Sequence, residues 1–199
     1  MMPIYIIGTK VLRLEGKEIT ADYPELDKLI QNMFKSMYES DGVGLAAPQV
    51  GLSIKLFVVD ASPYADDFPE ADGYKRVFIN AKILEYSGKD VVFNEGCLSI
   101  PGIREDVKRK SKIRIQYYDE NFQFHDEIIE GLPARIVQHE YDHTMGILFT
   151  DRLSQLRKTM LRNKLRAIAK GKFKVKYQVV LGNKQTIERY LQPLQKIDV

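Results

Sequence analysis

The stretch 138–143, QHEYDH, places His139 and His143 four positions apart, with Glu140 directly after the first histidine. In an α-helix, residues four apart lie on one face a turn from each other, so both imidazoles can bind one metal ion. Glu140 projects about 100° further round the helix, where its carboxylate can reach a water molecule beside the ion. The pattern predicts a metal-dependent hydrolase, although a histidine pair without the glutamate is more often an ordinary surface feature.

A catalytic ion of this kind needs three protein ligands and one open position, so the motif lacks one ligand. In one class of HExxH hydrolases a third histidine follows, but Phe149 stands at that position here. Cys97 is the only cysteine of the chain and lies upstream in NEGCLSIPG, where it can offer a thiolate. A lone cysteine is usually a small buried apolar residue, but the incomplete site favours a ligand. His125 competes for this role, although the strand pattern FQFHDEII around it is typical of a surface histidine.

A third stretch, GVGLAAPQV (42–50), could stabilise the negatively charged oxygen that forms when an amide is hydrolysed. Its two glycines let the backbone approach a ligand closely, and Gln49 offers a side-chain N–H. A phosphate-binding loop is excluded because no Gly-Lys-Ser/Thr sequence follows. Taken alone, this stretch indicates little more than a turn.

Together, GVGLAAPQV, EGCLS and QHEYDH resemble the peptide deformylases, metal-dependent enzymes that remove the formyl group from the N-terminal formyl-methionine of new polypeptides. The motifs stand in that family's order, and the resemblance covers roughly residues 4–170. Residue by residue, it implies a metal site formed by Cys97, His139 and His143. Glu140 would be the acid–base group, and Gln49 and the backbone N–H of Leu98 would hold the oxyanion.

The resemblance also implies a substrate pocket. Gly44 would lie beside the substrate backbone. The pocket for the methionine side chain would be built from Val43, Arg104, Leu132 and Ile136. Arg135 is a departure, because many family members have an aliphatic residue there. It lies one helical turn before His139, so we expect its head group at the rim of the pocket, where it would favour polar or acidic substrate residues.

The resemblance favours Fe²⁺ as the metal, with Zn²⁺, Ni²⁺ or Co²⁺ also possible, and one thiolate with two imidazoles suits each of them. It implies nascent formyl-methionyl peptides as substrates, in co-translational processing during protein biosynthesis. Two other functions stay open on the residues alone. They are a general HExxH metallopeptidase and a non-catalytic metal- or RNA-binding protein.

The elements that must position these residues follow from hydrophobic periodicity. A helix is predicted over 24–38, with Asp22 as its N-cap, and further helices over 133–145 and 153–169. Strands are predicted at 54–60, 76–81, 112–119 and 122–130. The fold class is therefore α+β, with antiparallel strands around a central HExxH helix, an N-terminal helix and a basic C-terminal helix.

The domain organisation predicted from the sequence is one catalytic domain over residues 1–170, followed by an extension over 171–199. GKFKVKYQVV (171–180) alternates lysines with apolar residues, as an edge strand does. The last 20 or so residues carry no clear pattern. The apolar stripe of the preceding helix, which we expect to face the body, consists of Leu153, Leu156, Met160, Leu161, Leu165 and Ile168.

Charge is spread unevenly along the 199 residues. Residues 1–151 carry 17 Lys/Arg against 25 Asp/Glu, whereas residues 152–186 carry 11 Lys/Arg and no acid. Such a basic segment attracts nucleic-acid phosphate. We expect it to bind the ribosome surface and do no chemistry, with Arg157, Lys158, Arg162, Lys164 and Arg166 largely free.

The surroundings expected for the protein are those of the cytoplasm. Its single cysteine excludes an internal disulfide and fits a reducing compartment. No apolar run is long enough to span a membrane, and the N-terminal sequence has no secretory leader pattern. Neither DNA nor a membrane is expected as a partner.

Overall fold

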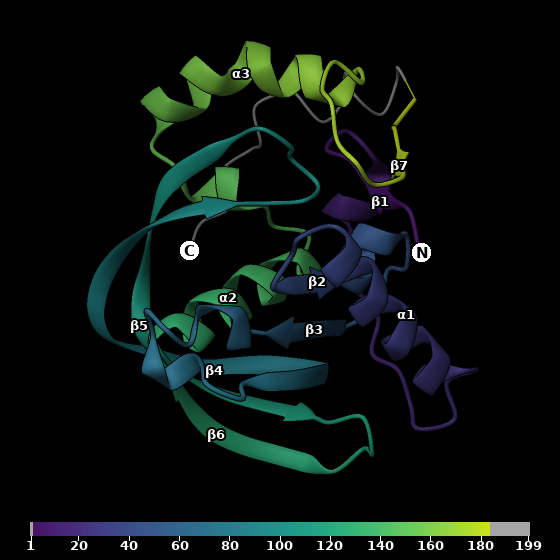
Figure 1. Ribbon diagram of the computed structural model, residues 1–199, viewed down its shortest axis with the longest axis vertical. Helices are drawn as coiled ribbons and strands as arrows, with labels where there is room; N and C mark the ends of the chain where they lie inside the picture. The colour runs from purple at the N-terminus through teal and green to yellow at the C-terminus, as the bar shows by residue number, and fades with distance from the viewer. Residues whose placement is uncertain (1, 184–199) are drawn as a thin grey trace.

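The computed structural model describes residues 2–183 and shows a curved antiparallel sheet wrapped around a central helix (Figure 1). The strand order is β2–β3–β4–β5–β6, and every neighbouring pair is antiparallel. The strands are β2 (Gly44–Ala46), β3 (Leu56–Asp60), β4 (Lys75–Gly96), β5 (Arg104–Tyr118) and β6 (Phe124–Glu130). This arrangement confirms the α+β fold class expected from the sequence.

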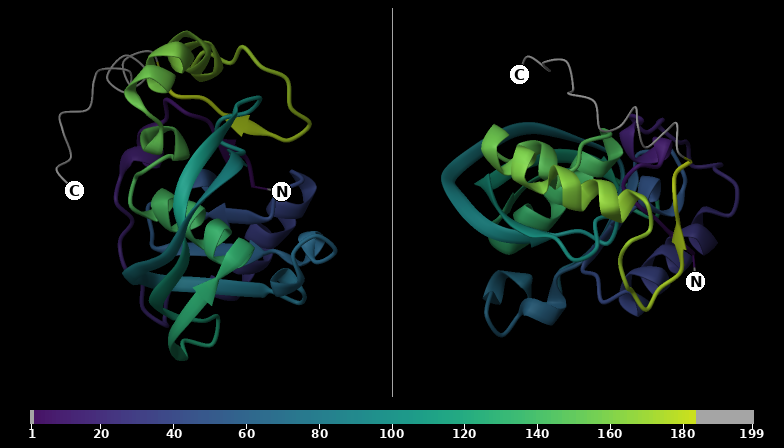
Figure 2. Two further views of the ribbon diagram at one scale, coloured as in Figure 1. Left: turned by 90° about the vertical axis from the view of Figure 1, so that its left-hand side faces the viewer. Right: turned by 90° about the horizontal axis from the view of Figure 1, so that it is seen from above.

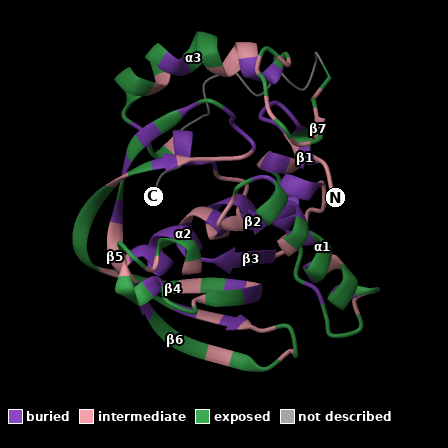
Figure 3. Ribbon diagram, viewed as in Figure 1, coloured by how far each residue is buried: buried purple, intermediate pink, exposed green. Residues whose placement is uncertain are grey.

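The central helix is α2 (Gly131–Thr144), which lies inside the curve of the sheet (Figure 1). Eleven of its 14 residues are buried, so it is covered on nearly every side (Figure 3). Gly146, just past its end, has a φ of 71°, a backbone angle that glycine adopts without strain. The predicted helix around QHEYDH is therefore confirmed, and α2 holds its polar side chains away from bulk water.

The long hairpin of β4 and β5 curls over α2 (Figure 1). Three register shifts between residues 79 and 90 interrupt the pairing, and shifts of this kind bend a strand pair. The hairpin closes with Gly96 opposite Arg104. It thereby delivers the connecting loop, residues 97–103, and with it Cys97, to the face of α2 that bears the histidines.

Both hairpin strands are longer than predicted. β4 joins the predicted segment 76–81 to residues 82–96, and β5 begins at Arg104 rather than near residue 112. The reason is visible in the buried positions Glu105, Val107 and Arg109, which alternate with exposed neighbours. Two of these three buried side chains are charged, so hydrophobic alternation did not mark the start of β5.

The N-terminal helix is α1 (Leu26–Glu39), which starts two residues later than predicted. Glu25 precedes it with a φ of 51° in the left-handed region, and this turn separates Pro24 from the helix. Asp22 is not the N-cap, because its carboxylate instead accepts a hydrogen bond from the Thr20 hydroxyl. The expected cap was therefore wrong, while the helix itself is confirmed.

The last helix, α3 (Gln155–Ala169), lies across the top of the molecule in the view of Figure 1. It packs on the body through Leu161, Leu165 and Ile168. Leu156 and Met160 were expected to share this face, but they are 71% and 62% exposed. At 100° per residue they project about 80° or more away from the packed side chains, so the buried stripe is narrower than predicted.

Two cations of α3 that were expected to be free are paired instead. Arg157 forms an ion pair with Glu105 of β5, with 2.6 Å between Nη2 and Oε2. Lys164 donates a hydrogen bond from Nζ to the Gly102 carbonyl oxygen over 2.7 Å. Both side chains therefore fasten α3 to the β4–β5 hairpin.

The strand expected over residues 171–180 is limited to β7 (Val179–Val180), which pairs in parallel with β1 (Ile4–Tyr5). Residues 171–178 form no strand, and the tail expected beyond residue 183 lies outside the described residues. Within the described part of the chain, no helix is long and apolar enough to cross a membrane.

Candidate metal centre and active site

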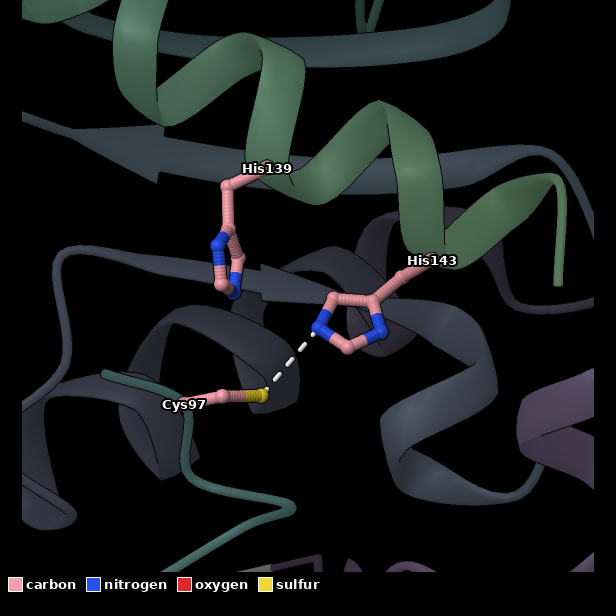
Figure 4. Close-up of side chains that lie close together, drawn as sticks. All are labelled: Cys97, His139 and His143. Atoms are coloured by element: carbon pink, nitrogen blue, oxygen red, sulfur yellow. Dashed lines mark hydrogen bonds between the residues drawn. The ribbon is translucent and has the colours of Figure 1, made fainter. Parts of the chain in front are cut away.

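The three predicted metal ligands come together beneath the hairpin loop. His139 and His143 project from one side of α2, and Cys97 reaches them from the loop (Figure 4). Their ligand atoms all lie within 4.8 Å of one another, with 3.3 Å between Cys97 Sγ and His143 Nε2. Ligand atoms around one tetrahedral ion are roughly 3.3–3.8 Å apart, so this triangle can hold a single ion after a small adjustment.

His125, the competing candidate for third ligand, lies elsewhere. It is on β6, where its Nε2 is 2.9 Å from an Asp119 carboxylate oxygen and its ring stacks on Tyr117. Asp119 also accepts two backbone hydrogen bonds in the turn after β5. His125 therefore belongs to the hairpin between β5 and β6.

Two buried polar atoms at the centre, His143 Nδ1 and Glu140 Oε2, have no hydrogen-bond partner among residues 2–183. An unpartnered buried polar atom costs about 1–3 kcal/mol, so the carboxylate of Glu140 is available to a group that enters the cavity. Gly44 makes room for it, because a Cβ at Gly44 would lie 2.5 Å from Glu140 Oε1. The residues present thus fit a metal ion with a water molecule beside Glu140.

The electrostatics of the centre suit proton transfer. Burial raises the pKa of Glu140 to about 7, so its carboxyl group can take up and release a proton near neutral pH. Burial lowers the pKa of His143, and the neighbouring His139 and Arg109 lower it further. Its ring therefore stays neutral, as a metal ligand must.

His139 has the opposite shift. Burial lowers its pKa, but the hydrogen bonds with Cys97 and Glu95 and the charge of Glu140 prevail and raise it well above its usual value. These negative groups favour a positive charge on the His139 ring. The same electrostatic field would favour a cation bound beside it.

Glu95, near the end of β4, orients the first histidine. Its Oε2 lies 2.9 Å from His139 Nδ1, which directs Nε2 toward the cluster. Arg109 donates to Glu95 over 2.7 Å and to Asp142 over 2.7 Å, and all three side chains are buried. Burial would raise the pKa of Glu95, but the bonds from His139 and Arg109 hold it far below its usual range. Glu95, Arg109 and Asp142 thus form a buried network behind His139.

Arg135 does not offer its head group at the rim as predicted. The residue lines the cavity but is only 6% exposed. Its guanidinium donates to Glu95 over 2.9 Å and to the Val107 carbonyl over 3.0 Å, and it also bonds the Val91 carbonyl. Arg135 does project from the predicted face of the helix, but the β4–β5 hairpin covers that face and its backbone carbonyls and Glu95 bind the guanidinium.

The two predicted oxyanion donors both lie next to Cys97. Gln49 is buried in a 3-10 turn (Ala47–Val50), and its Oε1 accepts a hydrogen bond from the Ala46 N–H over 2.8 Å. This turns Nε2 toward the site, 3.5 Å from Cys97 Sγ and 3.3 Å from Ser99 Oγ. Leu98 comes directly after Cys97 in the chain, and among the described residues its backbone N–H has no hydrogen-bond acceptor.

The cavity beside the centre measures about 420 Å³. Its lining includes every predicted substrate residue, namely Val43, Gly44, Arg104, Leu132, Arg135 and Ile136. Arg104 is exposed, and Asn94 holds its guanidinium through bonds of 3.0 and 2.6 Å. The sequence prediction missed Lys174, Val175 and Tyr177, which close another side. Their alternating pattern was visible, but nothing in it indicated that this segment returns to the active site.

This fold, with a possible Cys/His/His metal site beside a buried glutamate, defines the class of protein as a metal-dependent hydrolase. The chain matches the polypeptide deformylase family over residues 1–159 and belongs to it. The peptide deformylase of Christiangramia forsetii is 49% identical over 190 residues, which cover 92% of this chain and 97% of that protein. That of Flavobacterium johnsoniae is 49% identical over 186 residues, 90% of this chain and 95% of that protein.

Solved structures agree with this membership. A mutant of Arabidopsis thaliana peptide deformylase 1B superposes with a TM-score of 0.77 at 38% identity, covering 85% of this chain and 90% of that one. The Plasmodium falciparum peptide deformylase in complex with an inhibitor gives 0.73 at 38% identity, covering 84% and 99%. The protein is thus a metal-dependent hydrolase that removes the formyl group from the N-terminal formyl-methionine of nascent polypeptides. General peptidase and non-catalytic binding functions are set aside.

Replacing Glu95 with glutamine should weaken metal binding about ten- to a hundredfold, because the amide holds His139 less firmly. Competition between a chelator and the nickel-loaded protein measures this affinity. Glu105→Gln is the matched control, since Glu105 is also buried and paired with an arginine but does not contact a histidine. Equal affinities in the two variants would contradict the role given to Glu95.

Proposed function

We propose that Cys97, His139 and His143 hold one divalent ion and that Glu140 moves the proton during deformylation. The observation that carries this proposal is the meeting of three ligand atoms within 4.8 Å beside a buried carboxylate that lacks a partner. The stated pKa of about 7 supports the same role, because Glu140 can both accept and return a proton.

The reaction is hydrolysis of the formyl amide. The ion, when bound, lowers the pKa of a coordinated water and polarises the carbonyl. Glu140 accepts one proton of the water whose oxygen attacks the formyl carbon. Gln49 Nε2 and the Leu98 N–H donate to the carbonyl oxygen as it becomes negative, each contributing about 3 kcal/mol. When the carbon–nitrogen bond breaks, Glu140 returns the proton to the amine, giving formate and a free N-terminus.

The shape of the cavity supports the placement of the substrate. Leu132, Ile136 and Val43 are among the apolar residues of its lining, which suits the methionine side chain. Gly44 borders the cavity next to Glu140 without a side chain of its own, so a substrate backbone can lie close to it. Arg104 stands at the exposed part of the lining, where it can meet residues that follow the methionine.

Fe²⁺ is the native metal in this proposal, with Zn²⁺, Ni²⁺ and Co²⁺ as substitutes. One thiolate and two imidazoles accept all of these ions. A ferrous site with a thiolate ligand needs reducing surroundings, and together with the unpaired Cys97 this favours the cytoplasm as the place of action.

Glu140→Gln should retain the metal and lose at least about a hundredfold in kcat, because the amide cannot take up a proton. Formate release from a formyl-Met peptide, with the metal content measured on the same sample, checks both parts. Cys97→Ser is the variant for comparison, since it should instead bind the metal more weakly. Near-normal turnover in Glu140→Gln, or loss of its metal, would remove Glu140 from the proposed role.

We also propose that α3 binds the ribosome surface through a basic stripe of Lys158, Arg162, Arg166 and Lys170. These residues follow one another at four-residue spacing, so they lie along one side of the helix. Within residues 2–183 none of them is in an ion pair, in contrast to Arg157. The absence of acids on this helix leaves the stripe strongly attractive to phosphate.

Reversing Lys158, Arg162 and Arg166 to glutamate should abolish co-sedimentation with ribosomes at low salt and leave deformylation of short peptides nearly unchanged. The slope of binding against salt should fall by about one unit for each cation removed. The matched control reverses three exposed lysines elsewhere, Lys35, Lys82 and Lys89, for the same change in net charge. If the stripe variant and the control variant co-sediment with ribosomes equally well, the proposal is wrong and the stripe is only a solvated surface.

A further inference from the structure

The C-terminal arm, residues 171–180, runs from the end of α3 back to β1 (Figure 2). Its residues Lys174, Val175 and Tyr177 line the active-site cavity. It is fixed at its far end, where the N–H groups of Ile4 and Ile6 donate to the carbonyls of Gln178 and Val180 over 2.8 and 2.9 Å. Tyr177 precedes this pairing and packs against the hydrophobic core. Its ring therefore has a defined position at the cavity.

The Tyr177 hydroxyl donates a hydrogen bond to the Leu98 carbonyl oxygen over 2.9 Å. The carbonyls on either side are held as well, Cys97 by the Ile100 N–H over 3.0 Å and Ser99 by the Ile7 N–H over 2.9 Å. Three successive carbonyls are thus fixed, one from within the loop, one by the C-terminal arm and one by the N-terminal segment. The Leu98 N–H shares its peptide plane with the Cys97 carbonyl, which the Ile100 N–H holds, and Tyr177 holds the next peptide plane. Leu98 is therefore fixed on both sides, and this limits the directions that its N–H can take.

The hydroxyl of Tyr177 remains a donor throughout the neutral range. Burial, and then the negative charge of Cys97, raise the pKa of Tyr177 to about 12. Lys164 bonds the same loop at Gly102, four residues further on, and does not touch the peptides around Leu98. The two contacts can therefore be separated by mutation.

We propose that Tyr177 is a positioning residue for deformylation, which acts through the Leu98 carbonyl to aim the Leu98 N–H at the developing oxyanion. This inference rests on the proposed oxyanion role of Leu98. A hydrogen bond weakens steeply as its angle departs from linearity, so a loosened peptide stabilises the transition state less well. The C-terminal arm thus contributes to the rate without contacting the substrate through this hydroxyl.

Tyr177→Phe is the direct test, because it removes the hydroxyl and keeps the ring in the cavity wall. In the zinc-loaded enzyme, kcat should fall about three- to tenfold, as expected for one hydrogen bond. KM should stay within about twofold, and the metal content and the melting temperature should match the wild type. The amide resonance of Leu98 in a ¹H–¹⁵N spectrum should shift. Lys164→Met, the matched control, should leave both kcat and the Leu98 resonance unchanged.

Two results would overturn the inference. One is a wild-type kcat and an unmoved Leu98 resonance in Tyr177→Phe. The other is an equal loss of kcat in Lys164→Met, which would show that any slackening of the loop has the same effect. Gln49→Leu, which removes the other proposed donor, reports separately on the oxyanion proposal. A wild-type kcat in that variant would count against the donor role of Gln49, while the Leu98 resonance still decides whether Tyr177 orients the loop.

Discussion

The centre depends on one buried carboxylate, that of Glu95. It accepts hydrogen bonds from Arg109 on β5 and from Arg135 and His139 on α2, while Glu95 itself belongs to β4. Two neighbouring strands and the central helix therefore meet at one negative group. Buried charge is stable only when it is paired and hydrogen-bonded, so the position of Cys97, two residues after Glu95, is tied to the position of the helix that bears both histidines.

The same constraint explains why the hairpin is long and why α2 is buried. Without the curl of β4 and β5, the loop carrying Cys97 would not reach His143, and Arg135 would lie at the surface. The cavity that results keeps Glu140 away from bulk water and raises its pKa, which a surface carboxylate would not show. Rigidity around Glu95 and reactivity at Glu140 thus arise from one packing arrangement.

The sequence predicted the local features well, because spacing alone determines which side chains share a helix face. This spacing was enough to predict that His139, Glu140 and His143 act together, and the need for a third ligand indicated Cys97. The sequence did not predict the long-range packing. Arg135 was placed on the correct side of its helix, but the β4–β5 hairpin covers that side through Val91 and Val107, and two of the buried positions in β5 are charged. The return of Tyr177 to Leu98 joins residues 79 positions apart and left no local pattern.

The central claim, that one ion is held by a thiolate and two imidazoles, is tested most directly by X-ray absorption at the zinc edge of the zinc-loaded protein. The geometry described above predicts one sulfur at about 2.3 Å and nitrogens at about 2.0–2.1 Å. The sulfur contribution should disappear in Cys97→Ser. A wild-type spectrum that contains only nitrogen and oxygen neighbours would contradict the assignment of Cys97 and with it the proposed centre.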